Sequence, residues 1–69
     1  MIANDTELET TLDRIRWFQQ QVAHLRKTEK LPTNYRAAAA GFLAEIDRMQ
    51  RDVREFFSLH PLELSSSAA

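Results

Sequence analysis

The chain has 69 residues, with nine Lys or Arg, ten Asp or Glu and no Cys. A chain this short forms one small domain with a marginal core, and without Cys it has neither disulfides nor the usual Cys-type zinc site, so a second subunit is the natural source of further burial. Its net charge of -1 excludes the strong positive field of a generic nucleic-acid-binding protein. No secretion signal and no apolar run of the roughly 20 residues needed to span a membrane are visible, so we expect a cytoplasmic protein that binds no membrane.

The first predicted element is a helix over about residues 5–30, after a lead of residues 1–4. Asn4 or Thr6 can cap this helix, because each is followed three residues later by a Glu, the spacing of a capping box. Pro32 disfavours the helical conformation at Leu31, so the helix should end near Lys30. Apolar side chains recur at helical spacing and define an inner face, which consists of Leu8, Thr11, Leu12, Ile15, Phe18, Val22 and Leu25.

A turn at residues 31–33 separates this helix from a second one, predicted over about residues 34–59 and capped by Thr33 or Asn34. The apolar positions of the second helix alternate in steps of four and three, which is a heptad seam. They are Tyr35, Ala39, Phe42, Ile46, Met49, Val53 and Phe56. Residues 61–69 are rich in Ser and Ala, and we predict a disordered tail there.

The short turn makes the two helices antiparallel. Folding the chain at Pro32 then places Phe18 opposite Ile46 and Ile15 opposite Met49, and every other apolar position of one seam also meets an apolar position of the other. The sequence therefore predicts an all-α fold, an antiparallel two-helix hairpin over residues 5–60.

Both apolar stripes are wider than a two-stranded seam requires. In a lone hairpin Leu12, Leu43, Phe56 and Phe57 would stay largely exposed, which monomers tend to avoid. A second copy related by a two-fold axis would cover them and close a dimeric four-helix bundle. The alternatives are a monomer or one half of a complex with a different protein. The predicted core and dimer contacts are Leu12, Ile15, Phe18, Val22, Phe42, Leu43, Ile46, Met49, Val53, Phe56 and Phe57.

The second helix has two further patterns. Oppositely charged residues four apart mark its solvated side, namely Asp47 with Arg51, Arg48 with Asp52, and Arg51 with Glu55. The five small residues 37–41, ending in Gly41, would let another backbone approach closely or leave a hollow for a bulky side chain of a partner.

No residue pattern indicates catalysis. His24 and His60 fall at opposite ends of the hairpin, and neither helix has the Glu-x-x-His spacing of di-metal bundles. The carboxylates fall at caps and charged faces, no base is placed to activate a Ser, and no Gly-rich phosphate loop occurs. We therefore expect no enzyme, no catalytic residues, no metal and no cofactor.

Trp17 is the candidate binding residue. By the helical count it lies about 160° from the centre of the inner face, among polar and basic residues. The predicted partner-binding set is Trp17, Arg14, Gln21, His24 and Lys27. Such a tryptophan suits a hot spot for a protein partner, although it could instead lie in the dimer contact or over a neighbouring side chain. The favoured function is a small protein–protein interaction module: an adaptor, an assembly subunit or the neutralising partner of another protein.

The alternative function is RNA binding through the same face, since an aromatic side chain among basic residues can stack on bases. The predicted dimer of short hairpins resembles, in architecture alone, a plasmid copy-control protein that binds paired RNA loops. That resemblance implies RNA as a partner but assigns no residue.

Overall fold

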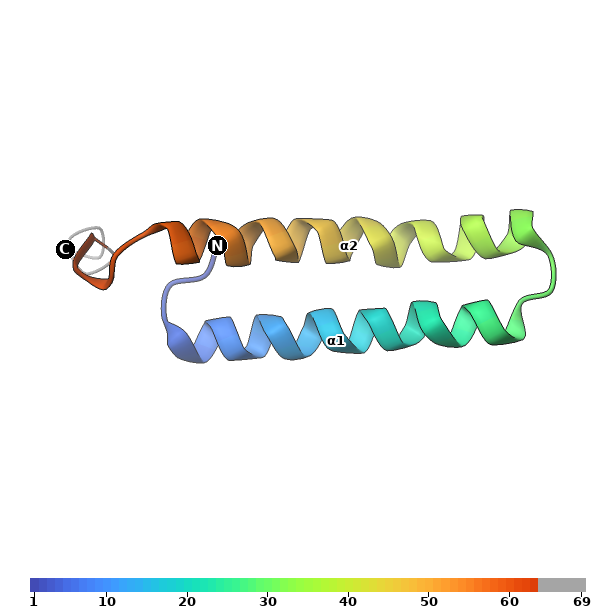
Figure 1. The fold of residues 1–69 in the computed structure, drawn as a ribbon, viewed down its shortest axis with the longest axis horizontal. Coiled ribbons are helices and arrows are strands. Elements are labelled where there is room, and N and C mark those ends of the chain that lie inside the picture. Colours follow the sequence, from blue (N-terminus) through green and yellow to red (C-terminus); the bar gives the residue numbers. More distant parts are fainter. Residues whose placement is uncertain (64–69) are drawn as a thin grey trace.

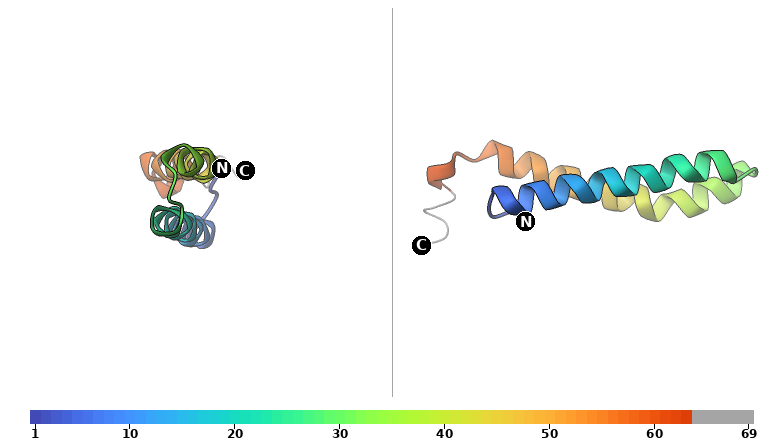
Figure 2. Two further views of the ribbon diagram at one scale, coloured as in Figure 1. Left: turned by 90° about the vertical axis from the view of Figure 1, so that its right-hand side faces the viewer. Right: turned by 90° about the horizontal axis from the view of Figure 1, so that it is seen from below.

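The computed structural model describes residues 1–63, which form two long helices and no strand. Helix α1 spans Asp5–Thr28 and helix α2 spans Pro32–Ser58. They run antiparallel and side by side (Figure 1), and the chain measures about 51 Å along its longest axis. Viewed from the side, they cross at a shallow angle (Figure 2). The predicted all-α antiparallel hairpin is therefore confirmed.

Helix α1 begins with an Asn4 cap. The Asn4 Oδ1 accepts a hydrogen bond of 2.8 Å from the backbone N–H of Glu7, which satisfies one of the free donors of the first turn. The Glu7 carboxylate reaches back to the N–H of Ala3 at 2.6 Å, one residue further than in a standard capping box. Asp5 and Glu7 in the first turn, with Arg26 and Lys27 in the last, suit the helix dipole.

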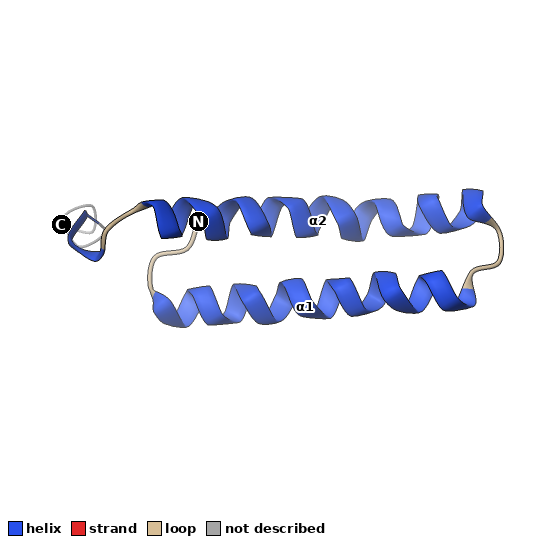
Figure 3. Cartoon of the chain, viewed as in Figure 1, coloured by secondary structure: helices blue, strands red, loops and turns tan. Residues whose placement is uncertain are grey.

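The turn differs from the prediction at the start of α2. Leu31 is the N-cap, no side chain caps the helix, and Pro32 occupies its first turn, so the expected cap at Thr33 or Asn34 is wrong. Proline suits this position because its fixed φ is already helical and its missing N–H would have had no helical acceptor. The Glu29 carboxylate accepts the N–H of Leu31 at 3.1 Å and stabilises the turn, which is drawn as a loop in Figure 3.

Beyond α2, Pro61 begins a short helical turn. The N–H of Glu63 donates to the carbonyl of His60, and the Glu63 carboxylate accepts the N–H of His60, both at 2.9 Å. The rest of the predicted tail, residues 64–69, lies outside the described residues.

The core is a single line of contact between the helices. Ile15, Ile46 and Met49 form a buried cluster. Three partly buried side chains pack against it: Phe18, Val22 and Val53. Ala39 is also buried, nearer the turn. These residues belong to the seams that the periodicity of the sequence predicts.

No periodic pattern predicts that Ile2 lies in the core, yet it is one of the most deeply buried side chains, at 5% exposure. The chain before α1 crosses over to α2 (Figure 1) and places Ile2 between the helices. We call residues 1–4 the N-terminal strap. Phe56, which lines a groove with Ile2, is only partly exposed, so the expectation that it would stay largely exposed is wrong.

Within the described residues, neither helix is long and apolar enough to cross a membrane. Gly41 is exposed, and a Cβ added to it would meet no atom within 4 Å. The described part of the chain therefore has no packing reason for this glycine.

Candidate interaction surfaces

The hairpin has two faces, one on each side of the line where its helices touch. Leu12 precedes the buried Ile15 by three residues, and Leu43 precedes the buried Ile46 by three. Each is thereby rotated about 60° from the seam in the same sense, at about 100° per residue. Because the helices are antiparallel, equal rotations in one sense lead to the same face of the hairpin.

We call this side the open face. Phe57 joins it, because it follows Val53 by four residues and is rotated about 40° in that same sense. The exposed fractions of Leu12, Leu43 and Phe57 are 41%, 45% and 67%. By the same count, the exposed polar residues Gln19 and Gln50 lie among them. The open face is therefore a row of large apolar side chains that nothing in the described chain covers.

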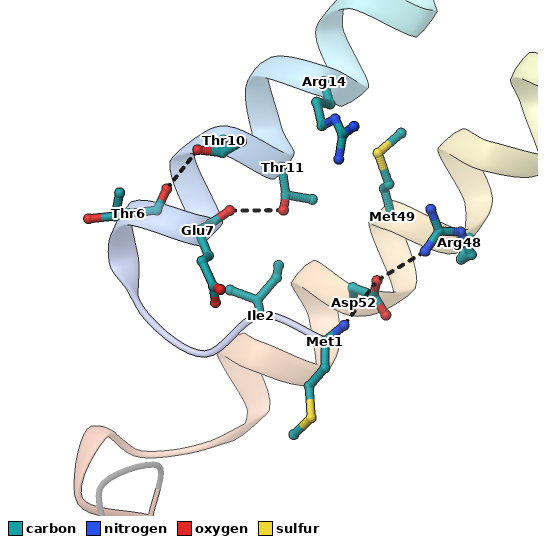
Figure 4. Close-up of a pocket in the computed structure, with 10 residues that line it drawn as sticks. All are labelled: Met1, Ile2, Thr6, Glu7, Thr10, Thr11, Arg14, Arg48, Met49 and Asp52. Carbon is teal, nitrogen blue, oxygen red and sulfur yellow. Dashed lines mark hydrogen bonds and ion pairs between the residues drawn. The ribbon is translucent and has the colours of Figure 1, made fainter. Parts of the chain in front are cut away.

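The opposite side, which we call the strap face, is covered at one end by the N-terminal strap. Figure 4 shows Ile2 between the two helices, with Met49 and Asp52 of α2 on one side and Thr11 of α1 on the other. These residues are rotated from the seam in the sense opposite to Leu43. On the strap face the side chain of Ile2 fills the gap between the two helices. The corresponding gap on the open face has no such residue within the described part of the chain.

A polar cluster surrounds the strap. The guanidinium of Arg48 contacts the Glu45 carboxylate at 2.7 Å and lies 4.0 Å from that of Asp52. The hydrogen bond to Glu45 is the main cause that raises the pKa of Arg48 above its ordinary value. The amino group of Met1 lies 3.8 Å from Asp52, whose side chain is largely buried. Asp52 thus helps to hold the strap, a role the sequence did not suggest.

The predicted charge pairs are only partly present. Arg48 does approach Asp52, but its closer partner is Glu45, three residues earlier. Within residues 1–63, no ion pair joins Arg51 to Asp47 or to Glu55. Arg51 is exposed, and water solvates its charge without a partner.

A groove on the strap face, which we call the strap-face groove, is lined by residues that include Thr10, Thr11, Arg14 and Met49. Its side chains offer few groups for chemistry. The hydroxyl groups of Thr10 and Thr11 both donate to backbone carbonyls one turn earlier, at 3.1 and 2.9 Å. The Glu7 carboxylate is engaged by the backbone at the helix cap. No group of three His, Asp or Glu side chains in the described part of the chain is arranged to hold a metal ion.

The helical count predicts that Trp17 points away from the seam, but the structure places its ring toward α2. Its ring packs edge-on against Phe18, with centroids 5.1 Å apart, and against Phe42 of α2 at 6.4 Å. Phe18 and Phe42 are themselves 5.7 Å apart, so the three rings form one cluster across the two helices. The indole leans back over the strap-face side of the seam and remains 52% exposed. It is an aromatic shelf held in place by two partly buried rings.

The other predicted partner-binding residues lie around this shelf or beside it. Gln21 is partly buried, whereas His24 and Lys27 are exposed further toward the turn. Arg14 lies on the other side of Trp17 along α1, and its guanidinium borders the strap-face groove (Figure 4). Arg14 and Lys27 take part in no ion pair within residues 1–63.

Comparison with known proteins adds no assignment. No protein family matches the chain, and neither the curated proteins nor the solved structures gave a match. No relative therefore lends site residues to this chain. The two surfaces that stand out, the open face and the Trp17 shelf, are identified by their exposure, packing and charge.

Proposed function

We propose that this protein is a small non-enzymatic protein–protein interaction module that works as a homodimer. In the dimer the open faces of two hairpins pack together and complete a four-helix bundle. One observation carries this proposal: Leu12, Leu43 and Phe57 gather on one face and remain 41% to 67% exposed. Exposed apolar side chains that gather on one face of a small protein are typical of association sites.

The dimensions suit a second copy of the same chain. Over the 24 residues of α1 the two-helix part of the rod is about 36 Å long and 16 Å wide. This footprint of roughly 580 Å² approaches the area of about 800 Å² that each partner contributes to a stable protein–protein interface. A two-fold arrangement would bury the same residues on both copies, so a single apolar row suffices for both sides. Only five side chains are buried among the described residues, so a dimer would add a second contact layer to a thin core.

The Trp17 shelf supports the second half of the proposal. Trp17 lies toward the strap face, so pairing of the open faces would leave it accessible. A half-exposed tryptophan held by two rings loses little side-chain freedom when a partner binds, which is a property of binding hot spots. The dimer would present two such shelves to a protein partner, as an adaptor, assembly subunit or neutralising protein does.

The mass of the protein in solution tests the homodimer. Light scattering on a sizing column, over a range of concentrations, should give a mass near twice 8.0 kDa. Leu43→Asp places a charge in the proposed interface and should give a monomer that keeps its helicity. Leu31→Asp is the matched control, because Leu31 is similarly exposed but lies in the turn, and it should remain dimeric.

A wild-type chain that stays monomeric at every concentration would contradict the homodimer. A Leu43→Asp variant that remains as dimeric as the wild type would show that the open face is not the contact.

A further inference from the structure

We infer that the two copies pack with their turns at opposite ends, α2 against α2 and α1 against α1, about a two-fold axis near Gln50. This arrangement rests on the proposed homodimer and specifies how the second copy sits on the open face. Two features of that face support this direction, namely the spacing of its apolar row and the level of Leu12, and the charges along its edges support the pairing of the open faces.

The apolar row on α2 is symmetric about Gln50. Leu43, Gln50 and Phe57 are spaced seven residues apart and therefore lie almost in line along the helix. If a second α2 runs antiparallel across this line with Gln50 at the centre, Leu43 of each copy meets Phe57 of the other. Both ends of the row then pair apolar with apolar, and the polar Gln50 amides meet at the centre, where they can hydrogen-bond to each other.

The first helix fits the same axis. Thr11 of α1 lines one groove together with Met49 and Asp52 of α2, so Leu12 lies close to the level of Gln50 along the rod. A two-fold axis at that level places Leu12 of one copy against Leu12 of the other. All three exposed apolar residues of the open face would then have apolar neighbours.

The opposite choice, with both turns at the same end, fits poorly. That arrangement would stack α1 of each copy on α2 of the other at the same level along the rod. Leu12 would then face Gln50, and Leu43 would face the region of Gln19. Apolar side chains would meet polar ones throughout, so the apolar row favours turns at opposite ends.

Charged residues border the open face in a self-complementary pattern. Asp47 and Arg54 of α2 each follow a seam residue by one position and are seven residues apart, centred close to Gln50. Glu9 and Arg16 have the same relation on α1, centred close to Leu12. None of these four side chains takes part in an ion pair within the described hairpin. In the inferred dimer Asp47 would pair with Arg54 of the second copy, and Glu9 with Arg16.

If the turns lay at the same end, these four residues would also meet oppositely charged residues of the second copy; Asp47, for example, would meet Arg16. They therefore support pairing of the open faces, whereas the apolar row sets the direction. The two directions differ in which residues a charge swap can rescue, and this difference makes them separable by experiment.

A disulfide test reads the direction directly. The natural chain has no Cys, so Gln50→Cys provides a single probe on each copy. Under mild oxidation it should cross-link the dimer, because a disulfide forms only between Cα atoms within about 7 Å. The matched control, Arg36→Cys, lies 14 residues nearer the turn and should not cross-link, since its two copies would be roughly 40 Å apart.

Mixing Gln50→Cys with Leu12→Cys separates the alternatives. Turns at opposite ends predict disulfides joining position 50 to 50 and 12 to 12, identified by mass spectrometry of the peptides. A disulfide joining position 50 to position 12 would overturn the inferred direction and leave the homodimer intact. A monomeric wild-type chain would instead overturn both proposals.

A charge swap gives a second test that does not depend on cysteines. Asp47→Arg and Arg54→Asp should each raise the dimer dissociation constant about tenfold, by placing like charges opposite each other on both sides of the axis. The double variant should return to within about threefold of the wild type, because the pair is restored with its charges exchanged. With the turns at the same end, the double variant would be weaker than either single variant, and that result would overturn the inference.

Discussion

The two faces of this hairpin are built from the same two helices at the same register, yet they differ in how they are covered. On the strap face Ile2 is buried to 5% exposure between α1 and α2, while on the open face Leu43 remains 45% exposed. Part of the difference comes from outside the helices. The four residues before α1 cross one side of the helix pair and leave the apolar row of the other side exposed.

The largest effect is expected from a change in the buried core that lies beneath both faces. Ile46→Asp places a charge in the buried cluster with Ile15 and Met49, which should cost several kcal/mol and unfold the hairpin. Circular dichroism should show loss of helicity. Leu43→Asp, three residues away on the open face, is the control and should keep its helicity. Unchanged melting of Ile46→Asp would mean that the seam has a different register.

Removing the strap contact should affect only one face. Ile2→Ser empties a buried apolar site and should lower the free energy of unfolding by about 2 kcal/mol, or roughly 10 °C in melting temperature. The mass in solution should not change, because the open face is untouched. Ala3→Ser, at an exposed neighbouring position, should have little effect. A variant at position 2 that becomes monomeric would show that the strap face also carries the association.

The Trp17 shelf should contribute less than the strap. Trp17→Ala removes the edge-on contacts with Phe18 and Phe42, worth about 1 kcal/mol for exposed aromatic pairs, and should lower the melting temperature by about 5 °C. Helicity and mass should stay as in the wild type. A loss as large as that of Ile2→Ser would instead place Trp17 within the structural core.

The smallest expected effect concerns RNA. Trp17 is the only tryptophan, so its fluorescence reports on this surface alone. Titration with poly(U) in low salt should leave the emission unchanged. A fluorescence change that weakens steeply with added salt, and is lost in Arg14→Ala or Lys27→Ala, would favour RNA binding over a protein partner.

The sequence predicted what depends on periodicity and missed what depends on single side chains. The seam that buries Ile15, Ile46 and Met49 follows from repeated spacing, because many residues must agree for a helix face to be apolar. Ile2 is one apolar residue in an aperiodic lead, and its burial is a tertiary contact that no local pattern encodes. Nothing in the spacing indicates that Asp52 helps to hold it.

Side-chain length explains why the ring of Trp17 lies elsewhere than predicted and why Arg48 has a second partner. A helical count gives the direction of the Cα–Cβ bond, but the long indole of Trp17 turns back to reach Phe42. Arg48 likewise has several acceptors within reach: it forms the predicted ion pair with Asp52 at 4.0 Å and a closer one with Glu45 at 2.7 Å. The choice between a monomer, a homodimer and a hetero-complex depends on contacts with a second chain, and a single hairpin does not contain those contacts.

The strap also changes how the hairpin can open. A two-helix hairpin is closed by its turn at one end only, so the far ends of the helices would normally fray and open first. Ile2 joins the start of α1 to the last turns of α2 and closes the second end without a covalent bond. Amide hydrogens near Met49 and Val53 should therefore exchange as slowly as those near Ala39, and the least protected part of α2 should begin only beyond Phe56.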